Sequence, residues 1–255
     1  MKTVPPIVLI PGMQCTEQMF TPLISALRHT LPEASVHVRP IIHDDLGSAA
    51  AASLEGVRKP AILVGHSLGG TIAMATARMF PDRVAGLALL CANPHGPRPD
   101  QIEYWQKMQS DVAAGNSDEV VNRTVSQLLL GEQTKAPGED FSDWRTACRA
   151  MAGETGNENF LAQLKIQLAR IDECPALSQF RGPVIAIAAE NDSLVKVEDA
   201  KASAGAAPDG QFEILPGASH MMPLTSPGSL AAALTEWILY RFMTKNSKET
   251  QRVLL

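Results

Sequence analysis

Ser67 stands at the centre of a motif whose spacing is typical of a nucleophilic serine. The motif has the form G-x-S-x-G over Gly65–Gly69, directly after the apolar run 61–64 and before a helix-forming stretch. On a sharp turn between a strand and a helix, the serine hydroxyl projects clear of the sheet, and glycines on either side avoid a collision. The alternative is a phosphate-binding or plain tight turn, but the lysine and glycine spacing of nucleotide sites are missing. The motif therefore predicts nucleophilic catalysis by Ser67.

A serine hydroxyl is a weak nucleophile and needs a base within hydrogen-bonding reach. Among the six histidines of the chain, His220 is the best candidate because it follows the strand-like run 211–215. It therefore lies beyond the carboxyl end of the last predicted strand, at the edge where α/β sheets place their sites. His29, His37 and His66 fall within a predicted helix, strand and turn, and we expect structural roles for them.

Asp192 is the predicted third member of a catalytic triad with Ser67 and His220. It follows the apolar run 184–189 and precedes His220 by 28 residues, so both lie at the same edge of the predicted sheet. There a carboxylate can orient the imidazole and stabilise its protonated form. Glu190 is the nearest competitor, since Asp199 lies too far into the next predicted helix. A helix-capping or turn role is the alternative for Asp192.

Acyl transfer also needs two amides that point at the developing oxyanion. One is expected from Leu68, the residue after the nucleophile. The other is expected from the loop after the first predicted strand, where Met13 is preferred to Gln14 and Gly12 lets the backbone approach closely.

The elements that must position these residues alternate between strands and helices. Helical patterns follow most of the strands, which predicts right-handed crossovers and a parallel sheet with helices on both faces. The predicted strands are 7–10, 36–42, 61–64, 84–91, 184–189 and 211–215. The predicted helices outside the central part of the chain are 19–30, 48–57, 67–80, 197–207 and 226–243.

The pattern changes in the central part of the chain, at 94–180. Helix-period segments replace the buried strands there, and glycine- or proline-containing breakers separate them. We therefore expect an α/β core formed by 1–93 and 181–255, with 94–180 inserted between two strands as a helical cap. The helical segments of the insertion are 101–112, 118–130, 141–151 and 160–171, with breakers at 136–138 and 153–156. The tail 245–255 is expected to fray.

These residues together resemble the α/β-hydrolase superfamily over nearly the whole chain, and the predicted cap is the least similar part. The segments that carry the resemblance are 9–13, 65–70, 190–192 and 217–220. The order serine, aspartate, histidine along the chain also matches that family. Two departures are the Pro11-Gly12 pair where a His-Gly pair is usual, and the missing antiparallel hairpin before the first strand. We therefore expect about six strands, all parallel.

The resemblance implies a serine hydrolase that cleaves a small ester or thioester through an acyl-enzyme, without a metal or an organic cofactor. Residues that we expect to line the substrate pocket are Gln14, His95, Tyr104, Trp105, Met108 and Trp144. The alternative for the aromatic residues and Met108 is packing within the cap. Lactonases, carbon–carbon bond hydrolases, cofactor-free peroxidases and amidases use the same triad, and a non-catalytic small-molecule receptor is a further alternative.

Composition narrows the set of partners. The chain has 255 residues, of which 45% are hydrophobic and 19% charged, as in an ordinary globular protein, and a net charge of -5 disfavours nucleic acid and anionic lipid. No apolar run approaches the roughly 20 residues that span a bilayer. We expect a cytoplasmic protein, with a homodimer left open.

The four cysteines have neither disulfide nor zinc spacing. His43 and the two aspartates after it are expected to form a solvated loop, because three adjacent residues rarely converge on one ion.

Overall fold

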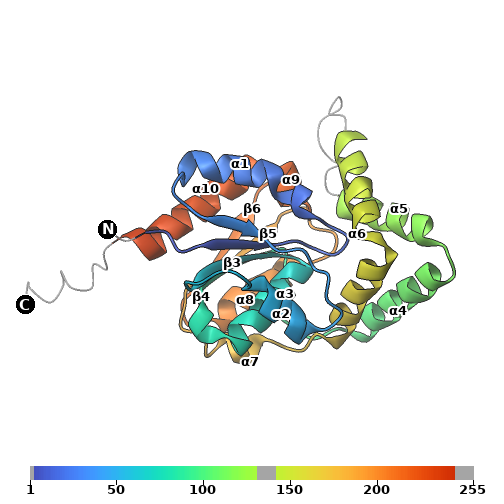
Figure 1. The fold of residues 1–255 in the computed structure, drawn as a ribbon, viewed down its shortest axis with the longest axis horizontal. Coiled ribbons are helices and arrows are strands. Elements are labelled where there is room, and N and C mark those ends of the chain that lie inside the picture. The colour runs from blue at the N-terminus through green and yellow to red at the C-terminus, as the bar shows by residue number, and fades with distance from the viewer. Residues whose placement is uncertain (1–2, 131–141, 245–255) are drawn as a thin grey trace, which may run out of the picture.

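A six-stranded parallel sheet forms the centre of the protein (Figure 1). The computed structural model describes residues 3–130 and 142–244. The strand order is β2-β1-β3-β4-β5-β6, and every neighbouring pair is parallel. The strands are β1 (Ile7–Ile10), β2 (Val36–Val38), β3 (Ala61–His66), β4 (Val84–Leu90), β5 (Val184–Ala189) and β6 (Gly210–Leu215). The predicted fold class is confirmed.

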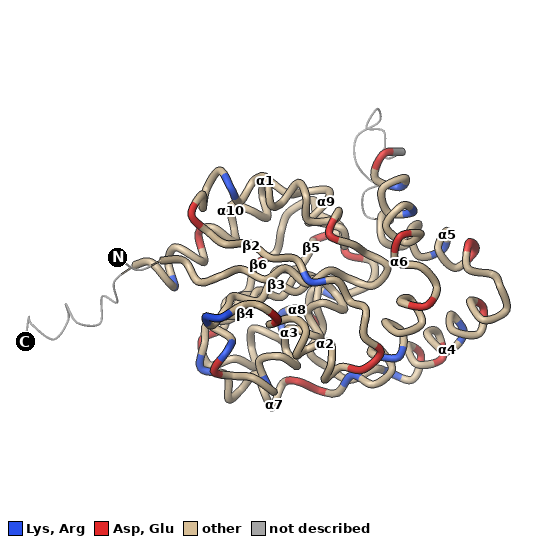
Figure 2. Tube along the Cα trace, in the orientation of Figure 1, with Lys and Arg blue, Asp and Glu red and all other residues tan. Residues whose placement is uncertain are grey.

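Helices cover both faces of the sheet, since the four inner strands bury apolar side chains on both sides. Successive residues of β1 enter opposite cores: Leu9 packs with Leu27 and Trp237, whereas Val8 packs in the other core. The helices α1 (Thr21–Thr30) and α10 (Pro227–Ile238) lie on one face (Figure 1). The helices of the other face are α2 (Leu46–Ser53), α3 (Leu68–Met79) and α8 (Val197–Ala206). The strands β1, β3, β4 and β5 carry no charged residue (Figure 2), as burial on two faces requires.

Three helices between β4 and β5 lie beyond the carboxyl ends of the strands (Figure 1). We refer to α4 (Pro99–Ala113), α5 (Ser117–Leu128) and α6 (Ser142–Ala169) as the α4–α6 layer. The layer has an apolar cluster of its own, in which Met108 and Leu164 are fully buried. The predicted breaker at 153–156 coincides with a kink in α6 at Gly156, where φ is 70°. Whether 94–180 forms a separate cap domain stays a prediction.

Strand β2 is shorter than predicted, because it ends at Val38 and not at Ile42. The Arg39 amide donates a hydrogen bond to the Leu9 carbonyl at 2.9 Å. On β1, the residue that would next donate to β2 is Pro11, which has no N–H, so the ladder cannot continue.

Other differences concern the ends of helices. Helix α2 begins two residues earlier than predicted, because the Asp45 carboxylate caps it by accepting from the Ser48 amide at 2.8 Å. The final helix gives way to a π-helical turn at Leu239–Met243. Two short helices, α7 (Cys174–Leu177) and α9 (Met222–Thr225), were not predicted as helices of their own. The predicted breaker 136–138, the start of the segment 141–151 and the tail 245–255 lie outside the described residues.

No helix in the described part of the chain combines the length and the apolar character needed to cross a membrane.

A substitution at Gly69 tests whether the close approach of α3 to β1 requires a residue without a side chain. A Cβ at Gly69 would lie 2.1 Å from the Ile10 carbonyl oxygen, so Gly69→Ala should lower the free energy of unfolding by about 1–3 kcal/mol in urea titrations. Gly205→Ala on α8 is the control, because its Cβ would meet nothing within 4 Å and should stabilise the helix by about 0.5–1 kcal/mol. Equal effects of the two substitutions would contradict the steric argument.

Candidate active site

Ser67 occupies a strained turn between β3 and α3. Its φ of 52° and ψ of -115° are unusual for a residue with a side chain. The Ser67 amide donates to the Leu90 carbonyl at 2.9 Å, which ties the turn to the end of β4. A Cβ at Gly65 would lie 2.4 Å from the Gly69 carbonyl oxygen, and one at Gly70 would lie 2.4 Å from the Ala92 Cβ. The turn is therefore possible only because glycines flank the serine.

His220 and Asp192 form a buried hydrogen-bonded pair. The distance from His220 Nδ1 to Asp192 Oδ2 is 2.8 Å, and their side chains are 2% and 1% exposed. The other oxygen, Asp192 Oδ1, accepts from the backbone amides of Leu194 and Val195 at 2.8 and 3.0 Å. Burial alone would raise the pKa of Asp192, but the charge and hydrogen bond of His220 and the two amides lower it to about 2. Asp192 is thus held as a carboxylate against the imidazole.

Backbone hydrogen bonds join the loop after β5 to the loop after β6. The Asn191 backbone amide donates to the Ala218 carbonyl at 2.8 Å. Asn191 directly precedes Asp192, so this bond lies next to the candidate acid. The Gly217 amide donates to Glu190 Oε2 at 2.7 Å. Glu190, the sequence competitor for the acid role, is therefore bound to the backbone of the loop that carries His220.

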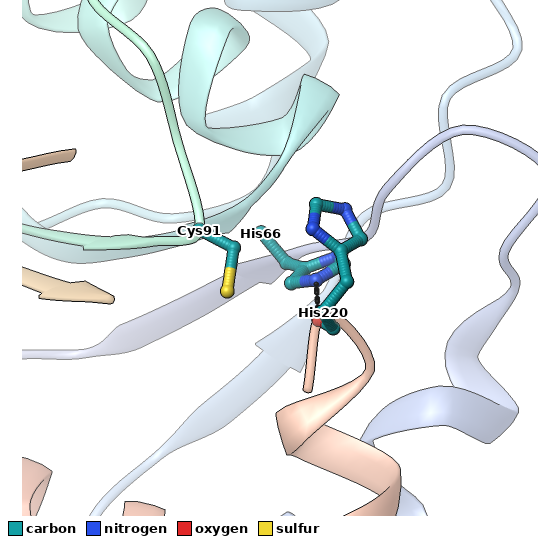
Figure 3. A group of neighbouring side chains, drawn as sticks. All are labelled: His66, Cys91 and His220. Carbon is teal, nitrogen blue, oxygen red and sulfur yellow. Dashed lines mark hydrogen bonds between the residues drawn. The ribbon is translucent and has the colours of Figure 1, made fainter. Parts of the chain in front are cut away.

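His66, the last residue of β3, makes a hydrogen bond to the backbone of His220. His66 Nε2 lies 2.8 Å from the His220 carbonyl oxygen (Figure 3). Since a carbonyl can only accept, Nε2 carries the proton. The two rings lie with centroids 4.9 Å apart. Burial, and then the nearby His220, lower the pKa of His66 to about 3, so it is neutral at ordinary pH. The sequence indicated a structural role but gave no signal for this partner, which is 154 residues away.

Cys91 lies beside both histidines at the end of β4 (Figure 3). Ligand atoms of Cys91, His66 and His220 lie within 4.8 Å of one another. Burial, and then the neighbouring Asp192, raise the pKa of the Cys91 thiol well above its usual value. A metal would need the thiolate, which this environment disfavours, so the three side chains are poorly suited to coordination.

A cavity of about 270 Å³ opens at Ser67 and extends to the α4–α6 layer. Of the residues predicted to contact the substrate, Tyr104, Trp105 and Met108 line it, as does the oxyanion candidate Met13. Other lining residues, for which the sequence gave no signal, include Cys91, Asn93, Arg98, Gln127 and Arg170. They come from separate loops and helices that only the folded chain brings together.

A model of the "Alpha/beta hydrolase family" matches residues 7–233. The chain belongs to the alpha/beta hydrolase family. The pimeloyl-[acyl-carrier protein] methyl ester esterase of Xylella fastidiosa (strain 9a5c) is 29% identical over 92% of this chain and 95% of its own. The biotin biosynthesis bifunctional protein BioHC of Cellvibrio japonicus is 25% identical over 92% of this chain, which spans 48% of that protein. A thermophilic esterase from Thermogutta terrifontis has the same fold, with a TM-score of 0.79, 21% identity and coverage of 95% and 92%. The predicted class, an enzyme of the carboxylic ester hydrolase type, is confirmed.

Three residues that we expected to contact the substrate of the hydrolase have other surroundings in the described structure, and their roles stay predictions. The Gln14 backbone amide donates to Gln163 Oε1 at 2.8 Å, so this amide is engaged, whereas the buried side-chain oxygen of Gln14 has no partner among the described residues. His95 lies at the surface beside Asp172. Trp144 packs against the apolar core. None of the three is among the described residues that line the cavity at Ser67.

The amide of Leu68 is available as an oxyanion donor. Leu68 is the first residue of α3, and the first amides of a helix have no acceptor within it. The same helix end also places positive potential near Ser67. Met13 lines the cavity after β1, as the sequence argument requires. The roles of Leu68 and Met13 in an oxyanion hole stay predictions.

The low pKa of His66 makes the hydrolase less stable in acid. The unfolded chain takes up a proton at His66 near pH 6.5, whereas the folded chain does so only near pH 3, so stability is lost as the pH falls between these values. This group should contribute about 1.4 kcal/mol per pH unit to the free energy of unfolding. His66→Asn should remove that part of the slope in urea titrations from pH 7 to pH 4.

The control for this measurement is His29→Asn, which changes an exposed histidine of α1. It should leave the pH dependence of the wild type in place. An equal slope in wild type and His66→Asn would contradict the assignment of His66 as a buried neutral group.

Proposed function

We propose that this hydrolase cleaves a small carboxylic ester or thioester through an acyl-enzyme on Ser67. His220 acts as the general base and Asp192 orients it. The observation that carries the proposal is the buried His220–Asp192 pair, held against the strained turn of Ser67 by the hydrogen bond from His66 to the His220 carbonyl.

The proposed reaction has two halves. His220 takes the proton of Ser67 as its oxygen attacks the carbonyl carbon, and the amides of Leu68 and Met13 stabilise the oxyanion. The protonated His220, stabilised by Asp192, then donates the proton to the leaving alcohol or thiol. Water attacks the acyl-enzyme with His220 again as base, and Ser67 is released with the acid product.

The relatives support an ester as the bond that is cleaved. The Xylella fastidiosa protein is named for a methyl ester, and it covers nearly the whole chain. The cavity of about 270 Å³ is at the small end of ligand sites, which supports a small substrate. The cytoplasmic location and the lack of a nucleic acid partner stay predictions from composition.

A fluorophosphonate probe tests the nucleophile directly. The probe should label wild type and should not label Ser67→Ala. Alanine tolerates the turn as well as serine does, so Ser67→Ala should stay folded and lose at least about 10³-fold in kcat on p-nitrophenyl acetate. A folded wild type that is not labelled, but binds a ligand and leaves it intact, would favour the receptor alternative.

Asp192→Asn tests the acid. The neutral amide can neither stabilise the imidazolium nor enforce the productive tautomer, so kcat should fall by about 10³- to 10⁴-fold. Glu190→Gln is the matched control, because Glu190 lies two residues away and bonds a backbone amide. It should change kcat by less than about 10-fold. A larger loss with Glu190→Gln than with Asp192→Asn would reassign the acid role.

A further inference from the structure

Arg170 is a buried cation in the wall of the cavity that opens at Ser67. The residue is 8% exposed and directly follows α6, whose carboxyl-terminal end favours a positive charge. Its guanidinium lies over the Trp105 ring at 5.1 Å from the centroid. Arg170 is therefore fixed in place by stacking, at a point from which it can meet a bound substrate.

The polar partners of Arg170 are neutral. Nη2 donates to Gln101 Oε1 at 3.0 Å, and Nη1 lies 3.5 Å from Gln167 Oε1. Within the described residues, the buried Nε–H has no acceptor and no carboxylate forms an ion pair with Arg170. Burial, and then Arg98, lower the pKa of Arg170 to about 10, while Asp199 acts in the opposite direction. The group is still charged at neutral pH.

The second arginine of the cavity already has carboxylate partners. Arg98 is half-exposed, and its guanidinium lies 3.4 Å from Asp199 and 3.7 Å from Asp100. Asp100 also lines the cavity, but its side chain is mostly exposed. The buried charge of the cavity wall is therefore positive, and it belongs to Arg170.

A buried cation without a counter-charge is costly, and a ligand can supply that charge. A guanidinium fits a carboxylate best, through two parallel N–H bonds. We propose that Arg170 binds a carboxylate at the end of the substrate remote from the ester that Ser67 attacks. This inference rests on the proposed ester hydrolysis and names its substrates as half-esters of small dicarboxylic acids.

The rest of the cavity suits such a substrate. The amide oxygens of Gln101 and Gln167 are oriented toward Arg170, so their NH₂ groups are left as further donors. A long apolar acyl chain would give these NH₂ groups no acceptor and the guanidinium no counter-charge in the cavity, which is unfavourable for buried polar groups. A short chain that ends in a carboxylate satisfies them.

The test compares half-esters with neutral diesters of the same length. The substrates are the monomethyl and dimethyl esters of succinic, glutaric and adipic acid, and the full chain is assayed for methanol release. Wild type should show a kcat/KM at least about 10-fold higher for the half-ester of best-fitting length. Arg170→Gln should lose about 10- to 100-fold on that half-ester, mainly through KM, and less than about 3-fold on the diester.

Two further variants separate binding from packing. Arg170→Lys keeps the charge and should retain part of the preference for half-esters. Arg149→Gln removes an exposed positive charge of α6 and should leave the preference unchanged. If Arg170 only packs on Trp105, then Arg170→Gln will lower Tm and reduce both activities equally. Equal losses, or a wild type that prefers the diester, would overturn the proposal.

Direct binding distinguishes this inference from the proposed catalysis. Ser67→Ala should bind monomethyl glutarate in calorimetry, and the added Arg170→Gln substitution should weaken Kd by at least about 10-fold. Binding that depends on Arg170 in a protein that cleaves no ester would reject the proposed hydrolysis and keep the anion site. Ester cleavage in which neither selectivity nor binding depends on Arg170 would reject the anion site alone.

Discussion

Helix α3 approaches the end of β1 so closely that Gly69 has no room for a side chain, and the arrangement of the site follows from this contact. The short path from β3 into α3 holds Ser67 in its strained conformation, with its hydroxyl at the carboxyl edge of the sheet. The same edge receives the loops after β5 and β6. The parallel sheet thus brings Ser67 and the two loops to one edge, and the close contact at Gly69 fixes the orientation of Ser67.

The architecture was predictable from sequence where local signals agree with the tertiary environment. Strands such as β5 are wholly apolar and bounded by breakers, so burial on both faces was evident from their composition. The predictions failed at positions set by a single interaction. Pro11 ends the ladder between β1 and β2, and the Asp45 cap starts α2 early, and neither changes the apolar pattern that indicates the element.

The candidate site was predictable where it depends on chain order and strand ends, as for Ser67, Asp192 and His220. The structure brings the last two into contact, which their common edge implied. It was not predictable where a side chain acts through a distant partner. No local pattern shows that His66 reaches the carbonyl of His220, or that Arg170 faces the cavity of Ser67, because each contact spans a large separation along the chain.

The buried apolar residues of α4 (Trp105, Met108 and Val112) belong to a small cluster apart from the two cores that flank the sheet, whereas residues of α5 and α6 such as Val125 and Ile166 pack into those cores. Substitutions on the cavity side of α4 can therefore alter which molecules are accepted without disturbing the packing on which Ser67 depends. Such a division allows selectivity to diverge during evolution while the chemical step is retained. Family members with one sheet and very different preferences are the expected outcome of that separation.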